Sequence, residues 1–160
     1  RIFDLVDQQP KVVDRPGAAT LEDALARAGG PLGSAQPRGR IEFTDVSFSY
    51  LPNEPVLHGV SFVAEPGETV ALVGPTGGGK STVINLLLRF YDVDSGSVKV
   101  DGFDVRDVTQ ASLRSRIALV PQDPFLFSGS VADNIRYGRL DASDEEVAEA
   151  AAMAGSSAPE

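Results

Sequence analysis

The fold is decided by Gly74-Pro75-Thr76-Gly77-Gly78-Gly79-Lys80-Ser81-Thr82, which fits the pattern G-x-x-x-x-G-K-[ST] of the phosphate-binding P-loop. The β-branched run Thr69–Val73 leads into this stretch and predicts a strand. The apolar residues of Val83–Leu88 follow at helical spacing and predict a helix. A strand before the loop and a helix after it are the context that a P-loop requires. The sequence therefore predicts a nucleotide-binding site at Gly74–Thr82.

The residue types of this loop suit a polyphosphate. Glycines leave room for backbone N–H groups to point inward, and the N-terminus of the following helix adds a partial positive charge. We expect Lys80 to reach the β- and γ-phosphates and the Ser81 hydroxyl to bind Mg²⁺. The alternative is a glycine-rich turn that happens to precede a helix. The predicted flanking strand and helix favour the phosphate site.

Composition narrows the class of protein. With 160 residues, the chain has about the length of one domain, and its 42% hydrophobic and 23% charged residues are ordinary for a globular protein. The net charge of -9 argues against nucleic acid as a partner, because such binding needs a basic face. No apolar run is long enough to span a bilayer, so we expect the chain by itself to be soluble. The absence of cysteine excludes disulfides and thiolate metal sites. The single histidine, His58, is given no role.

The N-terminal part differs in character from the rest. Residues 1–8 place their apolar side chains on one helical face, and Pro10 ends this pattern. No capping residue starts that helix, so we expect it to be the end of a longer one. Residues 10–39 are rich in Pro, Gly and Ala and are typical of a linker, with a short helix over Thr20–Ala28. The globular part is predicted over residues 40–160.

Alternating apolar residues predict an antiparallel layer beside a parallel core. Residues 41–50 alternate with a change of phase that indicates a bulge near Thr44-Asp45. Residues 60–64 predict a second strand, and Asp101-Gly102 is a strong hairpin signal. The continuous apolar run Ile117–Val120 is typical of a strand buried in a parallel sheet. Short helices are predicted over residues 109–116, 130–135 and, opening with a capping box, 143–153.

Three residues outside the loop are candidates for the same site. Tyr50 could stack on a purine ring, or it could cover the core as an edge-strand aromatic. Val56 could pack against the other edge of that purine. Gln122 follows the predicted strand Ile117–Val120, at the end of the strand that faces the nucleotide in P-loop folds. It could bind Mg²⁺ and orient a water molecule, or it could be a solvated side chain.

Four stretches carry a resemblance to a known family: Ile41–Tyr50, Val56-Leu57, Gly74–Thr82 and Val120–Ile135. In order and spacing, residues 40–155 resemble the nucleotide-binding domain of ATP-binding cassette (ABC) transporters. The match is closest to exporters, in which one polypeptide also carries the membrane domain. The resemblance implies an α/β P-loop NTPase fold, with a RecA-like parallel core sheet and an antiparallel β layer.

Residue by residue, the resemblance implies roles in binding and hydrolysing ATP. It makes Tyr50 the residue that stacks on adenine, with Val56 beside the ring. It makes Gly74–Thr82 the Walker A loop, with Lys80 as a catalytic residue. It makes Gln122 the Q-loop glutamine, a second catalytic residue that senses the γ-phosphate. ATP and Mg²⁺ are the implied cofactors, and the side chains implied to bind the metal are Ser81 and Gln122.

The resemblance also implies partners and a location. Residues 1–39 would be the end of the last membrane-domain helix and a linker, and residues 40–160 the N-terminal portion of the nucleotide-binding domain. Asp123–Ile135 would meet the coupling helices of that membrane domain. A second nucleotide-binding domain would pair head-to-tail, as a homo- or heterodimer. The expected location is the cytoplasmic face of the cell membrane, within an integral membrane protein and without nucleic acid.

Several family motifs have no counterpart in these 160 residues. We expect the signature loop, the Walker B aspartate with its catalytic glutamate and the switch histidine to lie C-terminal to residue 160. The fold would then be truncated before the signature loop and Walker B, and the isolated chain would be inactive as an ATPase. Three hypotheses follow: the ATP-binding portion of an exporter, a soluble ABC ATPase that works on DNA or ribosomes, or a non-catalytic nucleotide-binding fragment.

Overall fold

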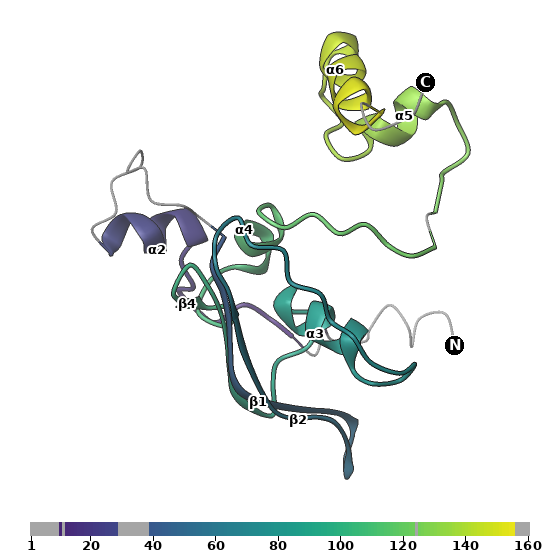
Figure 1. Ribbon diagram of the computed structural model, residues 1–160. Coiled ribbons are helices and arrows are strands. Elements are labelled where there is room, and N and C mark those ends of the chain that lie inside the picture. The colour runs from purple at the N-terminus through teal and green to yellow at the C-terminus, as the bar shows by residue number, and fades with distance from the viewer. Residues whose placement is uncertain (1–9, 11, 29–38, 124, 156–160) are drawn as a thin grey trace, which may run out of the picture. The chain divides into compact units, whose positions relative to one another are not determined.

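The computed structural model describes residues 10, 12–28, 39–123 and 125–155. The chain divides after Ala118 into two compact units. Among the described residues, the first unit contains a sheet with helices α2 to α4, and the second contains helices α5 and α6 (Figure 1). The helix expected over residues 1–8 lies outside the described residues.

An antiparallel sheet is the framework of the first unit. Its strands are β1 (Ile41–Leu51), β2 (Glu54–Ala64), β3 (Ser95–Val100) and β4 (Phe103–Asp104), in the order β2-β1-β3-β4. The register of β1 shifts against both neighbours after Phe43 and Thr44, and Asp45 has a φ of 48°. The predicted bulge at Thr44-Asp45 is therefore confirmed. The bulge bends β1, so that Phe43 before it and Val46 and Phe48 after it all face the core although their spacing is not even.

The turn at Asp101-Gly102 joins β3 to β4 as the sequence predicts. Both residues have a positive φ, 51° for Asp101 and 87° for Gly102, which is the backbone of a type I′ hairpin turn. The Asp101 carboxylate also accepts hydrogen bonds from the backbone N–H groups of Gly39 at 2.7 Å and Arg40 at 2.9 Å. The turn thus holds the start of β1 in place.

The parallel core sheet predicted at Thr69–Val73 and Ile117–Val120 is not formed by the described residues. Neither run is a strand, and the side chains of Val73 and Val120 are 93% and 91% exposed. An apolar pattern shows which residues could be buried, but a strand forms only where a neighbour accepts and donates its backbone hydrogen bonds. Among the described residues neither run has such a neighbour. The expectation of a RecA-like parallel sheet is corrected accordingly: the sheet present is antiparallel.

Side-chain caps begin four of the described helices, and the sequence predicts the caps at Thr20 and Ser143. Thr20, Thr109 and Ser130 each accept a hydrogen bond from the third backbone N–H of the helix that follows. Ser143 and Glu146 exchange the two bonds of the predicted capping box. The helices are α2 (Leu21–Arg27), α3 (Lys80–Leu87), α4 (Gln110–Arg114), α5 (Val131–Arg136) and α6 (Asp144–Gly155).

One apolar core fixes α3, the helix that follows the glycine-rich loop, against the sheet. Leu86 of α3 is 1% exposed and belongs to the same cluster as Phe43 of β1 and Val98 of β3, each also 1% exposed. Full burial of such a side chain stabilises the fold by about 1.5–3 kcal/mol. The loop is therefore attached to a helix that cannot shift without losing core contacts.

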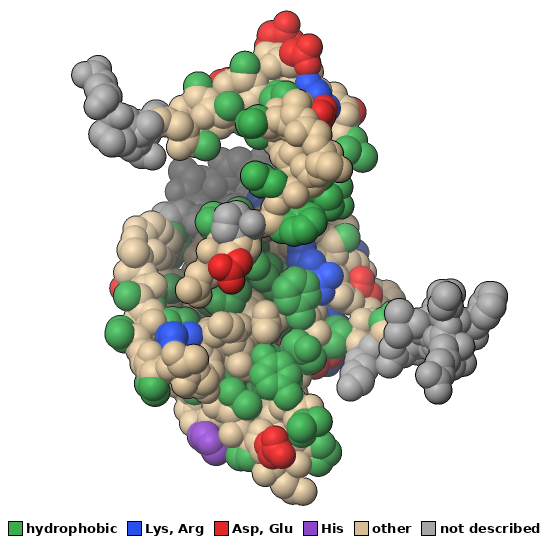
Figure 2. Space-filling model, turned by 90° about the vertical axis from the view of Figure 1, so that its right-hand side faces the viewer, with side chains coloured by type: hydrophobic (Ala, Val, Ile, Leu, Met, Phe, Trp, Pro, Cys, Tyr) green, Lys and Arg blue, Asp and Glu red, His purple; other side chains and the backbone are tan. Residues whose placement is uncertain are grey.

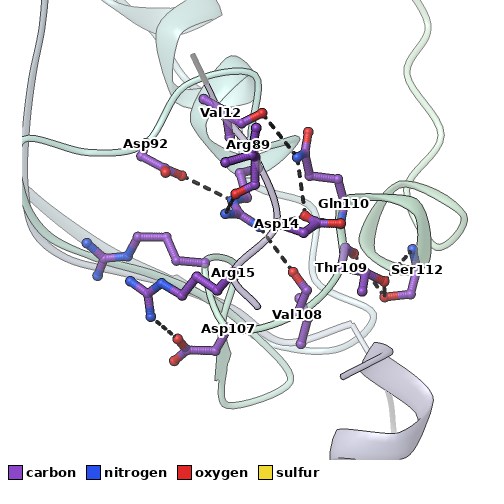
Figure 3. Close-up of polar contacts among 12 residues, drawn as sticks. Val12, Asp14, Arg15, Arg89, Asp92, Asp107, Val108, Thr109, Gln110 and Ser112 are labelled. Atoms are coloured by element: carbon purple, nitrogen blue, oxygen red, sulfur yellow. Dashed lines mark hydrogen bonds and ion pairs between the residues drawn. The ribbon is translucent and has the colours of Figure 1, made fainter. Parts of the chain in front are cut away.

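A buried arginine joins the segment before α2 to the end of α3 (Figure 3). Arg89 follows α3, is 1% exposed and has a φ of 52°. Its guanidinium donates to the Asp14 and Asp92 carboxylates at 3.2 and 3.1 Å, and to the carbonyls of Val13 and Val108 at 3.1 Å each. These bonds satisfy the buried charge and anchor the segment around Asp14 to the framework of the site.

Candidate nucleotide-binding site

The loop before α3 opens onto a cavity of about 350 Å³. Of the residues predicted for the site, Tyr50, Val56 and the run Gly77–Thr82 line this cavity together. Gly74, Pro75 and Thr76 precede them in the same exposed loop. The strands β1 and β2 bring the two side chains to a loop that follows them later in the sequence. The structure therefore assembles one concave site from most of the predicted residues.

Gly79 shows why this position of the loop is a glycine. Its φ is 82°, and it is the residue from which α3 starts. A Cβ atom built on Gly79 would lie 2.6 Å from Leu57 Cδ2 and 3.4 Å from the carbonyl oxygen of Val56. A side chain here would meet both the left-handed backbone penalty and β2. Only glycine therefore lets the loop approach β2 this closely.

The cavity concentrates hydrogen-bond donors and positive charge. The first N–H groups of α3 have no acceptor within the helix, and its first turn holds no acidic residue to neutralise them. The Lys80 ammonium donates to the carbonyl oxygens of Gly74 at 2.9 Å and Pro75 at 2.7 Å, which holds it over the loop. Backbone donors, a helix N-terminus and an ammonium group together fit a polyphosphate. The exposed hydroxyl of Ser81, in the first turn, is a donor atom of the kind that Mg²⁺ takes up.

Tyr50 is fixed by more contacts than an edge-strand aromatic needs. Its hydroxyl donates to Thr82 Oγ1 at 3.2 Å and accepts from Asn85 Nδ2 at 3.2 Å. Its ring makes edge-on contacts with Phe48 at 4.9 Å and with Tyr91 at 5.0 Å between centroids. Sequence reasoning missed Asn85 and Tyr91. Asn85 could have been found because asparagine is a poor helix former, so its presence inside a helix indicates a hydrogen bond to another segment.

Gln122 belongs to the second unit, where its side chain is exposed. Its expected contact with Mg²⁺ and the γ-phosphate stays a prediction. His58 is exposed as well, and Figure 2 shows the histidine in purple at the surface.

The second unit presents an apolar surface on the segment that was expected to meet coupling helices. The side chains of Phe125, Leu126 and Val131 are 76%, 75% and 78% exposed, and hydrophobic side chains of this kind are green in Figure 2. Asn134 of α5 holds the segment in shape, since its amide accepts from the Phe127 N–H at 2.8 Å and donates to the Phe127 carbonyl at 3.0 Å. A shallow cavity of about 340 Å³ lies between α5 and this segment.

Comparison with known proteins places the chain in a family. Residues 57–158 match the model of a family described as ABC transporter. ATP-binding cassette sub-family B member 6 of Homo sapiens is 51% identical over 154 residues, which are 96% of this chain and 17% of that protein. The fatty acid ABC transporter ATP-binding/permease protein of Mycobacterium bovis is 54% identical over 116 residues, 72% of this chain and 18% of that protein.

A solved structure gives the same answer for the fold. The chain resembles a bacterial Atm1-family ABC exporter with ATP bound, with 40% sequence identity and a TM-score of 0.80 over 97% of this chain and 25% of that one. The chain thus spans a quarter or less of the length of these relatives. Among the described residues, no helix is both long and apolar enough to cross a bilayer. This chain belongs to the ABC transporter family and carries the ATP-binding domain of its exporter branch.

Proposed function

We propose that this chain binds Mg-ATP at the cavity before α3 and, within a pair of cassettes, couples ATP binding and hydrolysis to transport of a substrate across a membrane. The observation that carries the proposal is the joint lining of one cavity by Gly77–Thr82, Tyr50 and Val56. The loop Gly77–Thr82 suits the triphosphate, and the Tyr50 ring, which lines the same cavity, suits the base.

Different residues of the chain bind the phosphates, the base and the metal ion. The N–H groups of the loop and of the first turn of α3 hold the phosphate oxygens, and Lys80 neutralises charge on the β- and γ-phosphates. Tyr50 supports the adenine ring and Val56 packs at its edge. Ser81 and Gln122 would hold Mg²⁺, which neutralises phosphate charge when bound. For Gln122 the support is its match to the family motif.

The partners follow from the relatives. The names of several relatives join ATP-binding and permease functions in one protein, which favours a transporter over a soluble ATPase that works on DNA or ribosomes. We propose a membrane domain in the same polypeptide, a second cassette paired head-to-tail, and a position at the cytoplasmic face of a membrane. The exposed apolar segment Phe125–Val131 is the surface proposed to meet that membrane domain.

The chain alone is proposed to bind Mg-ATP weakly and to hydrolyse it negligibly, because none of its 160 residues is assigned as the base that orients the attacking water. The test is a calorimetric titration of Mg-ATP into wild type, Lys80→Ala and the matched control Lys99→Ala. Lys99 lies on β3, and it is not among the residues that line the cavity. Circular dichroism verifies that all three are folded.

Loss of charge-assisted hydrogen bonds at Lys80 should weaken binding by roughly 10- to 100-fold, whereas Lys99→Ala should leave it nearly unchanged. Equal affinity of wild type and Lys80→Ala would contradict the proposed phosphate site. Steady hydrolysis by wild type that Lys80→Ala abolishes would confirm the site but contradict the proposed inactivity of the chain alone.

A further inference from the structure

A side chain that does not line the cavity is hydrogen-bonded to the Tyr50 hydroxyl. Asn85 lies on α3 but is not among the described residues that line the cavity. Its Nδ2 nonetheless donates to the Tyr50 hydroxyl at 3.2 Å, and that hydroxyl donates in turn to Thr82 Oγ1 at 3.2 Å. Because Asn85 supplies the donor, the Tyr50 proton is left free to point at Thr82. The three groups form one directed chain of hydrogen bonds.

We infer that Asn85 is a positioning residue for base recognition, acting through the Tyr50 hydroxyl on the ring that stacks against the base of a nucleoside triphosphate. The inference rests on the proposed function of the cavity. It adds a residue that carries no part of the phosphate cradle and that shares no motif with it. Asn85 should affect the affinity for the base and not the affinity for the phosphates.

The geometry explains how a distant amide can fix the ring. Phe48 and Tyr91 meet the Tyr50 ring edge-on, with interplanar angles of 88° and 87°. Edge-on neighbours hold the plane of a ring while leaving it 42% exposed for a ligand. Rotation about the Cα–Cβ bond would still swing the whole ring away from the cavity without a restraint at its far end. The hydroxyl, bonded to Asn85 and Thr82, supplies that restraint, so the platform is ordered before the base arrives.

The positions of the two partners on α3 suit this task. Thr82 and Asn85 are three residues apart, so they lie on the same face of the helix and can share one hydroxyl. Thr82 is 5% exposed and belongs to the phosphate-binding loop. The chain of hydrogen bonds therefore ties the base platform to the loop that holds the phosphates. Asparagine is a poorer helix former than alanine, and its bond to Tyr50 offsets that disadvantage.

The experiment compares two ligands that differ by the nucleoside. Affinities for Mg-ATP and for Mg-tripolyphosphate are measured on wild type, Asn85→Ala, Tyr50→Phe and the double variant. Tyr91→Phe is the matched control, since the Tyr91 ring contacts Tyr50 but its hydroxyl makes no hydrogen bond among the described residues. Asn85→Ala should weaken ATP binding about fivefold, the size expected for one neutral hydrogen bond, and Tyr50→Phe, which also removes the bond to Thr82, should weaken it at least as much. Tripolyphosphate binding should change less than about twofold.

The double variant should bind ATP no more weakly than Tyr50→Phe, because that change already removes the bond from Asn85. Equal losses for ATP and tripolyphosphate would overturn the inference and show that Asn85 supports the helix instead. Unchanged ATP binding in Asn85→Ala would also overturn it. If Asn85→Ala does not fold, Tyr50→Phe decides, because it keeps both the amide and the ring. A wild type that binds neither ligand would refute the proposed function itself, an outcome distinct from the others.

Discussion

Replacing Arg89 tests whether the segment around Asp14 is held to the end of α3 by this side chain. Arg89→Ala removes the four hydrogen bonds that the guanidinium donates to Asp14, Asp92, Val13 and Val108 (Figure 3). Loss of one partner of a buried ion pair typically costs about 3–5 kcal/mol. The two carboxylates, however, are 36% and 41% exposed and can regain water. We therefore expect the low end, a loss of about 3 kcal/mol in the free energy of unfolding.

The backbone of Arg89 allows a second, opposite comparison. Its φ of 52° lies in the left-handed region, which costs an L-residue about 1–2 kcal/mol and glycine almost nothing. Arg89→Gly loses the same side chain as Arg89→Ala but relieves this strain. Although glycine makes the unfolded chain more flexible, the glycine variant should be more stable than the alanine variant by about 1 kcal/mol.

Urea unfolding at neutral pH, followed by far-ultraviolet circular dichroism, measures all three proteins. Arg139→Ala is the control, because Arg139 pairs with Glu146 at the surface and is 59% exposed. That control should change the free energy of unfolding by less than about 0.5 kcal/mol. If Arg89→Ala costs no more than the control, Arg89 does not anchor the segment. If the glycine variant is the less stable of the two, the backbone at this position is not strained.

Two further changes test the loop and the β3–β4 hairpin. Gly79→Ala should lower the free energy of unfolding by about 3 kcal/mol, because it places an alanine in the left-handed region and brings its Cβ too close to Leu57. Gly74→Ala is the control and should be nearly neutral, because a Cβ on Gly74 has nothing within 4 Å. Equal costs for the two variants would refute the packing argument. Burial raises the pKa of Asp104, but hydrogen bonds from Arg106 lower it more, so its pKa lies below the ordinary 3.8 and the fold favours the carboxylate. Asp104→Asn should therefore cost about 1–2 kcal/mol at neutral pH, and the difference from wild type should shrink as the pH falls below 3.8; a difference that persists in acid would show that charge is not its source.

The local structure of the chain could be read from its sequence because the signals are local. The predicted caps at Thr20 and Ser143 satisfy N–H groups a few residues away, and the Asp101-Gly102 turn needs only its own backbone angles. The parallel strands could not be read in this way. An apolar run such as Ile117–Val120 becomes a strand only through hydrogen bonds to another segment, and the pattern does not say whether that segment is within reach.

The site divides along the same line. The glycines and Lys80 act on their own loop, so the motif places them without reference to anything else. Asn85 acts only because β1 carries the Tyr50 hydroxyl to α3, which lies thirty-odd residues later in the chain, and no spacing in the sequence announces that contact. In a P-loop protein the phosphate cradle is a property of one stretch, whereas the fit to the base is a property of two elements that meet. Substitutions that change which nucleotide is held should accordingly be sought where the side chains of β1 meet those of α3, at Tyr50, Thr82 and Asn85, and not among the glycines of the loop.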